Sequence, residues 1–214
     1  EATGFGAVYY LESVLQHEGD TIKGKTIAAS GFGNVCWGIC TKAAQLGAKV
    51  VTLSGPDGYV YDPDGVCTKE KIDFLLEMRA SGHDKVQDYA DKFGCQFVAG
   101  EKPWGVKADI IMPAATQNDV NMEQAKKIVA NGIKYYIEVA NMPTTNDALR
   151  YLMDQKNMIV APSKAVNAGG VSVSGLEMSQ NQEHLSWTAE EVVAKLRQIM
   201  KNIHDSSAAA AVRY

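Results

Sequence analysis

The stretch that decides the fold is KTIAASGFGNVCWGICTKAAQLGAKVVTLS, residues 25–54. An apolar run over residues 25–30 has the length of a strand and ends at Gly31. Apolar side chains then repeat with a helical period until Gly47, and a second apolar run covers residues 49–54. Strand, glycine turn, helix and strand within about 30 residues are typical of a βαβ unit. The segment therefore predicts two strands joined by a helix that crosses the sheet.

Two glycines stand in the turn between the first strand and the helix. Gly31, Gly33 and Cys36 have the spacing of the G-x-G-x-x-G/A fingerprint, in the strand-to-helix context that it requires. Gly31 permits a tight turn, Gly33 lets the backbone approach a pyrophosphate, and the helix N-terminus offers amide donors. Cys36 replaces the usual Gly or Ala but is small enough for close packing. The motif predicts a dinucleotide site; the alternative is a turn that only joins strand to helix.

Strands and helices continue to alternate along the chain. Apolar runs predict further strands at residues 96–98, 109–112, 135–139 and 158–160, and helical periods predict helices at residues 121–130 and 145–154. We therefore expect an α/β fold: a Rossmann-like, doubly wound, mostly parallel sheet with helices on both faces and a helical C-terminal tail.

Two segments stand outside this alternation. Residues 3–18 predict a lead-in helix with Thr3 as its N-cap and Gly19 as its end. Residues 55–82 begin with turn-forming residues and continue into a helix from Thr68, so we expect a hairpin or loop excursion there.

The C-terminal part is helical in pattern. Residues 163–179 and 188–204 have helical periodicity, and Thr188 and Glu191 have the spacing of a capping box.

The expected domain division follows from these patterns. Residues 1–180 form the dinucleotide-binding domain with its lead-in helix, and residues 181–214 form a truncated helical tail. Because the chain begins with Glu1 and ends within a helical pattern, we expect a fragment.

Composition narrows the function classes. The 21 basic and 25 acidic residues give a net charge of −4 without a basic run, which argues against nucleic acid as a partner. No apolar stretch of about 18 residues and no secretion signal occur, so we expect no membrane partner and a cytoplasmic location. The four cysteines lack metal-ligand or disulfide spacing, and the four histidines are scattered, so we predict no metal site.

The carboxylate expected to hold the ribose hydroxyls is displaced. The second strand ends at Ser54, and Asp57 follows three residues later in the turn SGPDG. A carboxylate there would repel a 2′-phosphate, and no Arg or Lys lies in the same turn, which favours NAD over NADP. The alternative is that Asp57 only forms the turn.

Several long motifs, in order along essentially the whole chain, carry a resemblance to a known family. They resemble the coenzyme domain of hexameric bacterial glutamate dehydrogenases, within the superfamily of glutamate, leucine, phenylalanine and valine dehydrogenases. The motifs are EATGFGAVYY (1–10), GFGNVCWG (31–38), SGPDGYVYDPDG (54–65), KPWGVKADIIMPAATQND (102–119), IEVANMPTT (137–145) and APSKAVNAGGVSVSGLEMSQN (161–181).

The resemblance implies a set of coenzyme-binding residues. The turn would hold the pyrophosphate, Phe32, Pro56 and Asp57 would set an NAD-type preference, and residues 115 and 116 would lie along the coenzyme. Asn141 would bind the nicotinamide carboxamide, with Thr3 on the same side. The set is Thr3, Gly31, Phe32, Gly33, Asn34, Val35, Pro56, Asp57, Ala115, Thr116 and Asn141. For each polar member taken alone, loop capping is the alternative.

The resemblance also implies a substrate pocket. Its lining would include Asn167, Gly170, Val171 and Ser174, with Ser174 donating a hydrogen bond to the distal carboxylate of the substrate. Taken alone, Gly169 and Gly170 could instead mark a helix kink, and the Ser174 hydroxyl could bond back to its own helix.

By the same resemblance, the parent enzyme converts L-glutamate, NAD and water to 2-oxoglutarate, ammonia and NADH. The family's catalytic lysine and aspartate match no residue here, so we expect the substrate-binding and catalytic N-terminal domain to lie outside this chain and predict no catalytic residue within it. We assign Lys164 a structural role. We expect the fragment to bind nucleotide without turnover, as a monomer or weak dimer, and the parent to be a homohexamer. The alternatives are a branched-chain or aromatic amino-acid dehydrogenase domain and a non-catalytic NAD-binding module.

Overall fold

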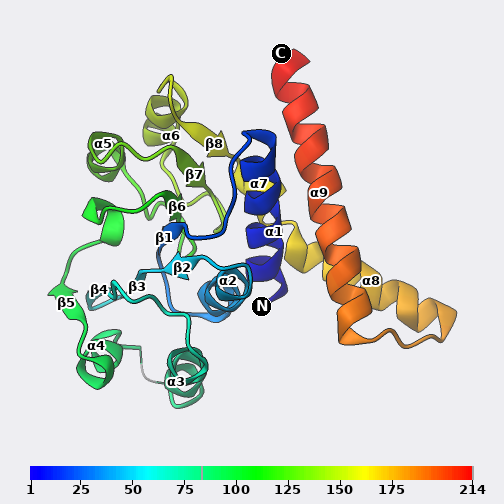
Figure 1. Cartoon of the computed structure of the whole chain (residues 1–214), viewed down its shortest axis with the longest axis horizontal. Helices are drawn as coiled ribbons and strands as arrows, with labels where there is room; N and C mark the ends of the chain where they lie inside the picture. Colours follow the sequence, from blue (N-terminus) through cyan, green and yellow to red (C-terminus); the bar gives the residue numbers. More distant parts are fainter. Residues whose placement is uncertain (83, 214) are drawn as a thin grey trace.

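Five parallel strands form the main sheet of the computed structural model, which describes residues 1–82 and 84–213 (Figure 1). Their order is β2-β1-β6-β7-β8, and every pair of neighbours is parallel. The bounds are β1 Thr26–Ala29, β2 Lys49–Val50, β6 Ile110–Met112, β7 Tyr135–Ile137 and β8 Ile159–Ala161. The expected Rossmann-like α/β class is confirmed.

Side chains of the central strands alternate between two cores. In β6, Ile110 and Met112 join the core beneath the helices α1 and α2, whereas Ile111 joins the core beneath α5 and α6. Tyr135 and Tyr136 of β7 divide in the same way. Successive residues of a strand point to opposite faces of the sheet, so each face of the sheet has its own apolar core, and helices cover both faces. The bounds are α1 Ala2–His17, α2 Asn34–Gln45, α5 Met122–Ala130 and α6 Asn146–Met153.

A second sheet corrects two expectations. The run at residues 49–54 is not one strand: β2 pairs with β1, and after a break at Val51 the chain continues as β3, which pairs with β4. The strand expected at residues 96–98 exists but joins this antiparallel sheet, of order β3-β4-β5. A continuous apolar run does not encode which neighbour it pairs with, so the sequence pattern could not reveal the division. The bounds are β3 Thr52–Gly55, β4 Gly58–Tyr61 and β5 Gln96–Ala99.

The hairpin and the helix expected within residues 55–82 are both present. β3 and β4 form the hairpin, and α3 (Lys69–Ala80) begins after Thr68, whose hydroxyl accepts a hydrogen bond from Lys71 N at 3.3 Å. The shorter α4 (Gln87–Phe93) and the 3-10 helix η1 (Pro103–Gly105) complete this half of the chain.

The lead-in helix α1 begins one residue earlier than expected. Thr3 lies inside the helix and Glu1 occupies the N-cap position, so the assignment of Thr3 as N-cap is wrong. α1 is nearly surrounded by protein and packs against α2, α8 and α9. Burial fixes this helix more strongly than a capping side chain could, since tertiary packing supplies most helical stability.

The C-terminal region forms three helices. The helix expected at residues 163–179 is divided at Asn167 into α7 (Ser163–Val166) and α8 (Gly169–Glu183), and α8 runs through residue 180, where we expected a domain boundary. α9 (Ala189–Arg213) starts with the expected capping box, in which Thr188 and Glu191 exchange hydrogen bonds of 2.7 and 3.2 Å. This long helix lies beside α1 (Figure 1).

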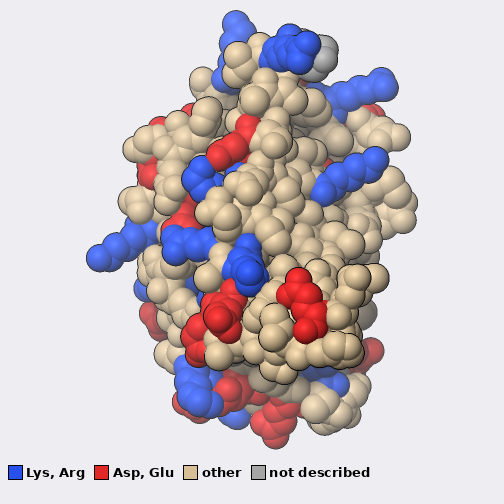
Figure 2. All heavy atoms as spheres, turned by 90° about the vertical axis from the view of Figure 1, so that its right-hand side faces the viewer, with Lys and Arg blue, Asp and Glu red and all other residues tan. Residues whose placement is uncertain are grey.

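The side of the molecule formed by α8 and α9 carries few charges in its middle (Figure 2). Val171 and Met178 of α8 are both 72% exposed. Among the described residues, none of the helices combines the length and apolar character that crossing a membrane would require.

Candidate functional site

A cavity of about 520 Å³ opens at the carboxyl ends of β1, β3 and β6. Open α/β sheets place their ligands at this edge. Most of the residues that the resemblance assigned to the coenzyme line this one cavity. Its lining is Gly31, Phe32, Gly33, Asn34, Val35, Ser54, Gly55, Pro56, Arg79, Lys102, Ala114, Ala115 and Thr116.

The turn between β1 and α2 has the backbone geometry that its glycines predict. Gly31 has a φ of +86°, a left-handed backbone conformation that residues with a side chain rarely adopt. A Cβ at this position would lie 3.3 Å from Ala115 Cα. Gly33 is the N-cap residue of α2, and a Cβ there would lie 2.7 Å from the Arg79 guanidinium. The turn therefore presents bare backbone and the start of a helix to the cavity.

Two serines that sequence reasoning missed hold the walls of the cavity together. Ser30 Oγ accepts hydrogen bonds from the backbone N–H groups of Ala114 and Ala115, at 3.0 and 3.2 Å. Ser54 Oγ accepts one from Gly31 N at 2.8 Å. Each serine ends an apolar run at the carboxyl edge, and that position was the available signal. These bonds fix the loop after β6 and the glycine turn relative to each other.

The Asp57 carboxylate binds backbone N–H groups outside the cavity. Its two carboxylate oxygens accept hydrogen bonds from Val86 N and Gln87 N, both at 3.1 Å, at the start of α4. Pro56 lines the cavity, whereas Asp57 is absent from its lining. The geometry matches the capping alternative for Asp57, although its charge still lies at the tip of the β3–β4 hairpin.

Two cations that the sequence did not single out also line the cavity. Lys102 forms an ion pair with the buried Asp119 at 2.6 Å. Arg79, in the last turn of α3, extends its guanidinium to Gly33 in the glycine turn. The hairpin turn itself contains no Arg or Lys, as the sequence showed. The cavity beside it nevertheless contains an arginine, because α3 brings in Arg79, which lies 46 residues beyond Gly33 in the chain. Only the packing of α3 against α2 could have revealed it.

The remaining predicted residues gather in a second group. Asn167 Nδ2 donates to Asn141 Oδ1 at 2.8 Å, which joins the loop after β7 to the turn before α8. Thr3 Oγ1 lies 2.6 Å from where a Cβ of Gly170 would stand. The structure thus brings together the residues assigned to the nicotinamide side (Thr3, Asn141) and those assigned to the substrate (Asn167, Gly170).

Val171 and Ser174 lie further along α8, and both are exposed. Ser172 bonds back to the carbonyl of Ala168 at 2.7 Å. Within residues 1–82 and 84–213, the Ser174 hydroxyl makes no such bond to its helix. It is therefore available to a ligand or to another part of the protein.

The loops after β6 and β7 connect the two groups. Asn118 N donates to Met142 O at 3.0 Å, and Val120 N donates to Pro143 O at 2.9 Å. Both Asn118 and Met142 adopt positive φ, of 55° and 46°. These bonds make one continuous edge from the glycine turn to α8.

The chemistry of this edge fits a dinucleotide. The glycine turn offers backbone N–H groups and room for phosphates, and Arg79 offers a cation. At the other end, the amide of Asn141 and the hydroxyl of Thr3 suit a carboxamide. In the described part of the chain, no three His, Cys, Asp or Glu side chains are arranged to hold a metal ion.

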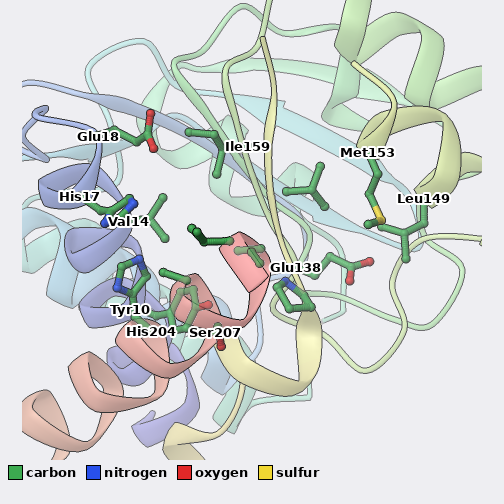
Figure 3. Close-up of a pocket in the computed structure, with 16 residues that line it drawn as sticks. Tyr10, Val14, His17, Glu18, Glu138, Leu149, Met153, Ile159, His204 and Ser207 are labelled. Atoms are coloured by element: carbon green, nitrogen blue, oxygen red, sulfur yellow. The ribbon is translucent and has the colours of Figure 1, made fainter. Parts of the chain in front are cut away.

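A second groove, of about 460 Å³, lies between α1, α9 and β8 (Figure 3). His17 and His204 face each other there with ring centroids 5.7 Å apart, so the expectation that the histidines are scattered is wrong for this pair. His83 lies outside the described residues. Glu138 also lines the groove; it accepts a hydrogen bond from Ser163 N, and burial raises the pKa of its carboxyl. The groove contains none of the predicted site residues.

A parallel sheet of order β2-β1-β6-β7-β8, a glycine turn after its first strand and a cavity at its carboxyl edge define a Rossmann-like α/β domain. The chain belongs to the Glutamate/Leucine/Phenylalanine/Valine dehydrogenase family, whose model matches residues 1–214.

Two curated relatives are named NAD-specific glutamate dehydrogenase. The Clostridium symbiosum protein is 74% identical over 214 residues, which are 100% of this chain and 48% of that protein. The Bacteroides fragilis protein is 58% identical over 205 residues, 95% of this chain and 46% of that protein. A solved glutamate dehydrogenase structure has a TM-score of 0.98 at 74% identity, covering 99% of this chain and 47% of that one. The chain spans about half the length of these relatives.

Proposed function

We propose that this chain is the coenzyme-binding domain of an NAD-dependent glutamate dehydrogenase. The parent reaction converts L-glutamate, NAD and water to 2-oxoglutarate, ammonia, NADH and a proton. The observation that carries the proposal is the cavity at the carboxyl edge, since residues 31–35, which the resemblance assigns to the pyrophosphate, all line it. Both relatives are named NAD-specific glutamate dehydrogenase, which agrees with this reaction.

The residues of the chain bind and orient the coenzyme. The backbone of residues 31–35 holds the pyrophosphate, and Ala115 and Thr116 lie along the dinucleotide. Thr3 and Asn141 fix the nicotinamide ring through its carboxamide. NAD, when bound, accepts the hydride from the substrate Cα, and the protein supplies binding and orientation.

The substrate contacts come from α8 and the turn before it. The hydrogen bond between Asn141 and Asn167 links the two ligands' binding residues, so the ring and the substrate Cα are positioned by one connected element. Ser174 donates a hydrogen bond to the distal carboxylate of glutamate. An apolar amino acid would gain nothing from that hydroxyl, which favours glutamate over leucine or phenylalanine.

The family's catalytic lysine and aspartate are supplied by the part of the protein outside this chain. Residues 1–214 alone therefore bind nucleotide weakly and do not turn over. The exposed apolar side chains of α8 suit a pocket wall that this other part closes.

Titration of the 214-residue chain with NADH and NADPH tests the proposal. We expect saturable binding of NADH, tighter than that of NADPH because the Asp57 carboxylate at the hairpin tip disfavours a 2′-phosphate. Equal or tighter NADPH binding would contradict the coenzyme preference, and no NADH binding would contradict the proposed function. Assay of the full-length parent with glutamate and leucine separates the dehydrogenase alternatives, and no turnover of either would favour a non-catalytic module.

A further inference from the structure

Arg79 has no structural partner that explains its position. It lies in the last turn of α3 and is exposed, and its side chain makes no hydrogen bond or ion pair with any residue in the described ranges 1–82 and 84–213. Its guanidinium nevertheless extends over the glycine turn, where Nη1 stands 2.7 Å from the place of a Gly33 Cβ. A cation at a helix C-terminus is favourable by itself, but that does not require the side chain to cross to another helix.

The charges around the cavity leave Arg79 uncompensated. Within the described residues, its only charged lining side chains are Arg79 and Lys102, and Lys102 is paired with Asp119 at 2.6 Å. The nearest hairpin carboxylate, Asp57, is held by the N–H groups of Val86 and Gln87. A free guanidinium at the wall of a cavity favours an anion, and its planar fork matches phosphate oxygens.

The position of Arg79 distinguishes between the phosphates of a dinucleotide. The 2′-phosphate of NADP sits on the adenosine ribose, beside the end of the second strand, here Ser54 to Asp57. The pyrophosphate lies on the glycine turn, where the second glycine admits it. Arg79 reaches Gly33, in the turn where the pyrophosphate lies. At the end of the second strand, the side chain beside Gly55 is instead the Asp57 carboxylate, which stands 2.8 Å from where a Cβ of Gly55 would be.

We propose that Arg79 is a coenzyme-binding residue that contacts the pyrophosphate. It therefore strengthens the binding of NADH and the binding of NADPH by the same factor, and it does not determine the preference between them. This inference rests on the proposed function. Arg79 comes from α3, a helix outside the βαβ unit that carries the fingerprint. The phosphate site is therefore built by two segments of the chain, the turn at Gly33 and the end of α3.

The test compares Arg79→Met and Arg79→Lys with a matched control. Arg150→Met removes an exposed arginine that likewise lies in the last turn of a helix, α6, but does not line the cavity. The 214-residue chain and the three variants are titrated with NADH, NADPH and adenosine. Unfolding by urea shows that each variant is folded.

We expect Arg79→Met to weaken NADH and NADPH by about the same factor, about tenfold, because hydrogen bonds to charged groups are the strong ones. Adenosine, which has no phosphate, keeps its affinity. Arg79→Lys keeps the charge without the fork and loses about threefold, and Arg150→Met loses nothing. The NADH affinity of Arg79→Met also depends less steeply on salt, a change that a purely structural role would not cause.

Three outcomes for the Arg79 variants overturn the inference. Loss of NADPH affinity alone would assign Arg79 to the 2′-phosphate, and unchanged affinity for both coenzymes would leave it without a binding role. Equal losses for adenosine and the coenzymes would indicate a distorted cavity. If the unmodified chain failed to bind NADH at all, the proposed function itself would be wrong, and the inference with it.

Discussion

Two regions of this molecule depend on glycine for opposite reasons. The glycine turn presents its backbone to an open cavity. The glycine turn consists of Gly31 and Gly33. We use the name glycine seam for the four glycines at which α1 contacts α2 and α8, namely Gly4, Gly6, Gly38 and Gly169.

The atoms that a Cβ would meet differ between the two regions. At Gly4 it would lie 2.3 Å from Val35 O and 2.8 Å from Ile39 N, both backbone atoms of α2. At Gly33 it would meet only the end of the Arg79 side chain. Backbone atoms of a packed helix cannot move aside, whereas a long side chain can. The seam glycines therefore serve stability, and Gly33 serves the approach of a ligand.

The seam nevertheless contributes to the site. Because Gly169 N and Cα lie so close to Gly6, helix α1 can place Thr3 against Gly170. The nicotinamide end of the proposed site thus depends on a helix contact, and the phosphate end depends on a turn.

Gly4→Ala should produce the largest effect. The added Cβ would overlap two backbone atoms of α2, so we expect unfolding in urea to show a loss of about 3 kcal/mol, at the upper end for overpacking. A loss below about 1 kcal/mol would mean that α1 can shift without cost, and the distinction between seam and turn would not hold.

Gly33→Ala should separate binding from stability. Arg79 can swing away from the added methyl group, so we expect the free energy of unfolding to stay within about 0.5 kcal/mol, as for surface substitutions. NADH affinity should fall about tenfold, because the methyl group keeps the pyrophosphate from the backbone. Isothermal titration and urea unfolding of the same preparation measure both. A stability loss like that of Gly4→Ala would erase the comparison.

Gly175→Ala should have the smallest effect and serves as the control. This glycine lies in α8, has no positive φ, and a Cβ there would meet nothing within 4 Å. Because alanine favours helix, we expect a gain of about 0.5–1 kcal/mol. A destabilised variant would show that α8 tolerates no added methyl group, so that loss at a seam glycine could not be attributed to its contact.

Much of the fold was predictable because local patterns encode it. The strand, turn and helix around Gly31 and the capping box at Thr188 depend on neighbouring residues only. The break at Val51 between β2 and β3 was not predictable, because an apolar run of six residues suits one strand or two. The role of Asp57 depends on α4, which begins 30 residues later.

The candidate site divides along the same line. Fingerprint and resemblance together identified the turn, the loops after β6 and β7 and the start of α8. Arg79 and Lys102 were missed because each reaches the cavity from a separate segment, and a single residue without a motif carries no signal. Ser30 and Ser54 were missed although each ends an apolar run, because their hydrogen bonds to the loop after β6 and to the glycine turn depend on how the strands pack.

The sequence by itself determined the α/β class, the glycine turn and the family resemblance, since periodicity, turn chemistry and motifs are properties of neighbouring residues. Only the tertiary structure decided which cation faces Gly33, which donors hold the Asp57 carboxylate and how closely α1 meets α2 and α8. Those relations depend on the packing of segments far apart in the chain, where a difference of one Cβ changes whether two backbones can touch.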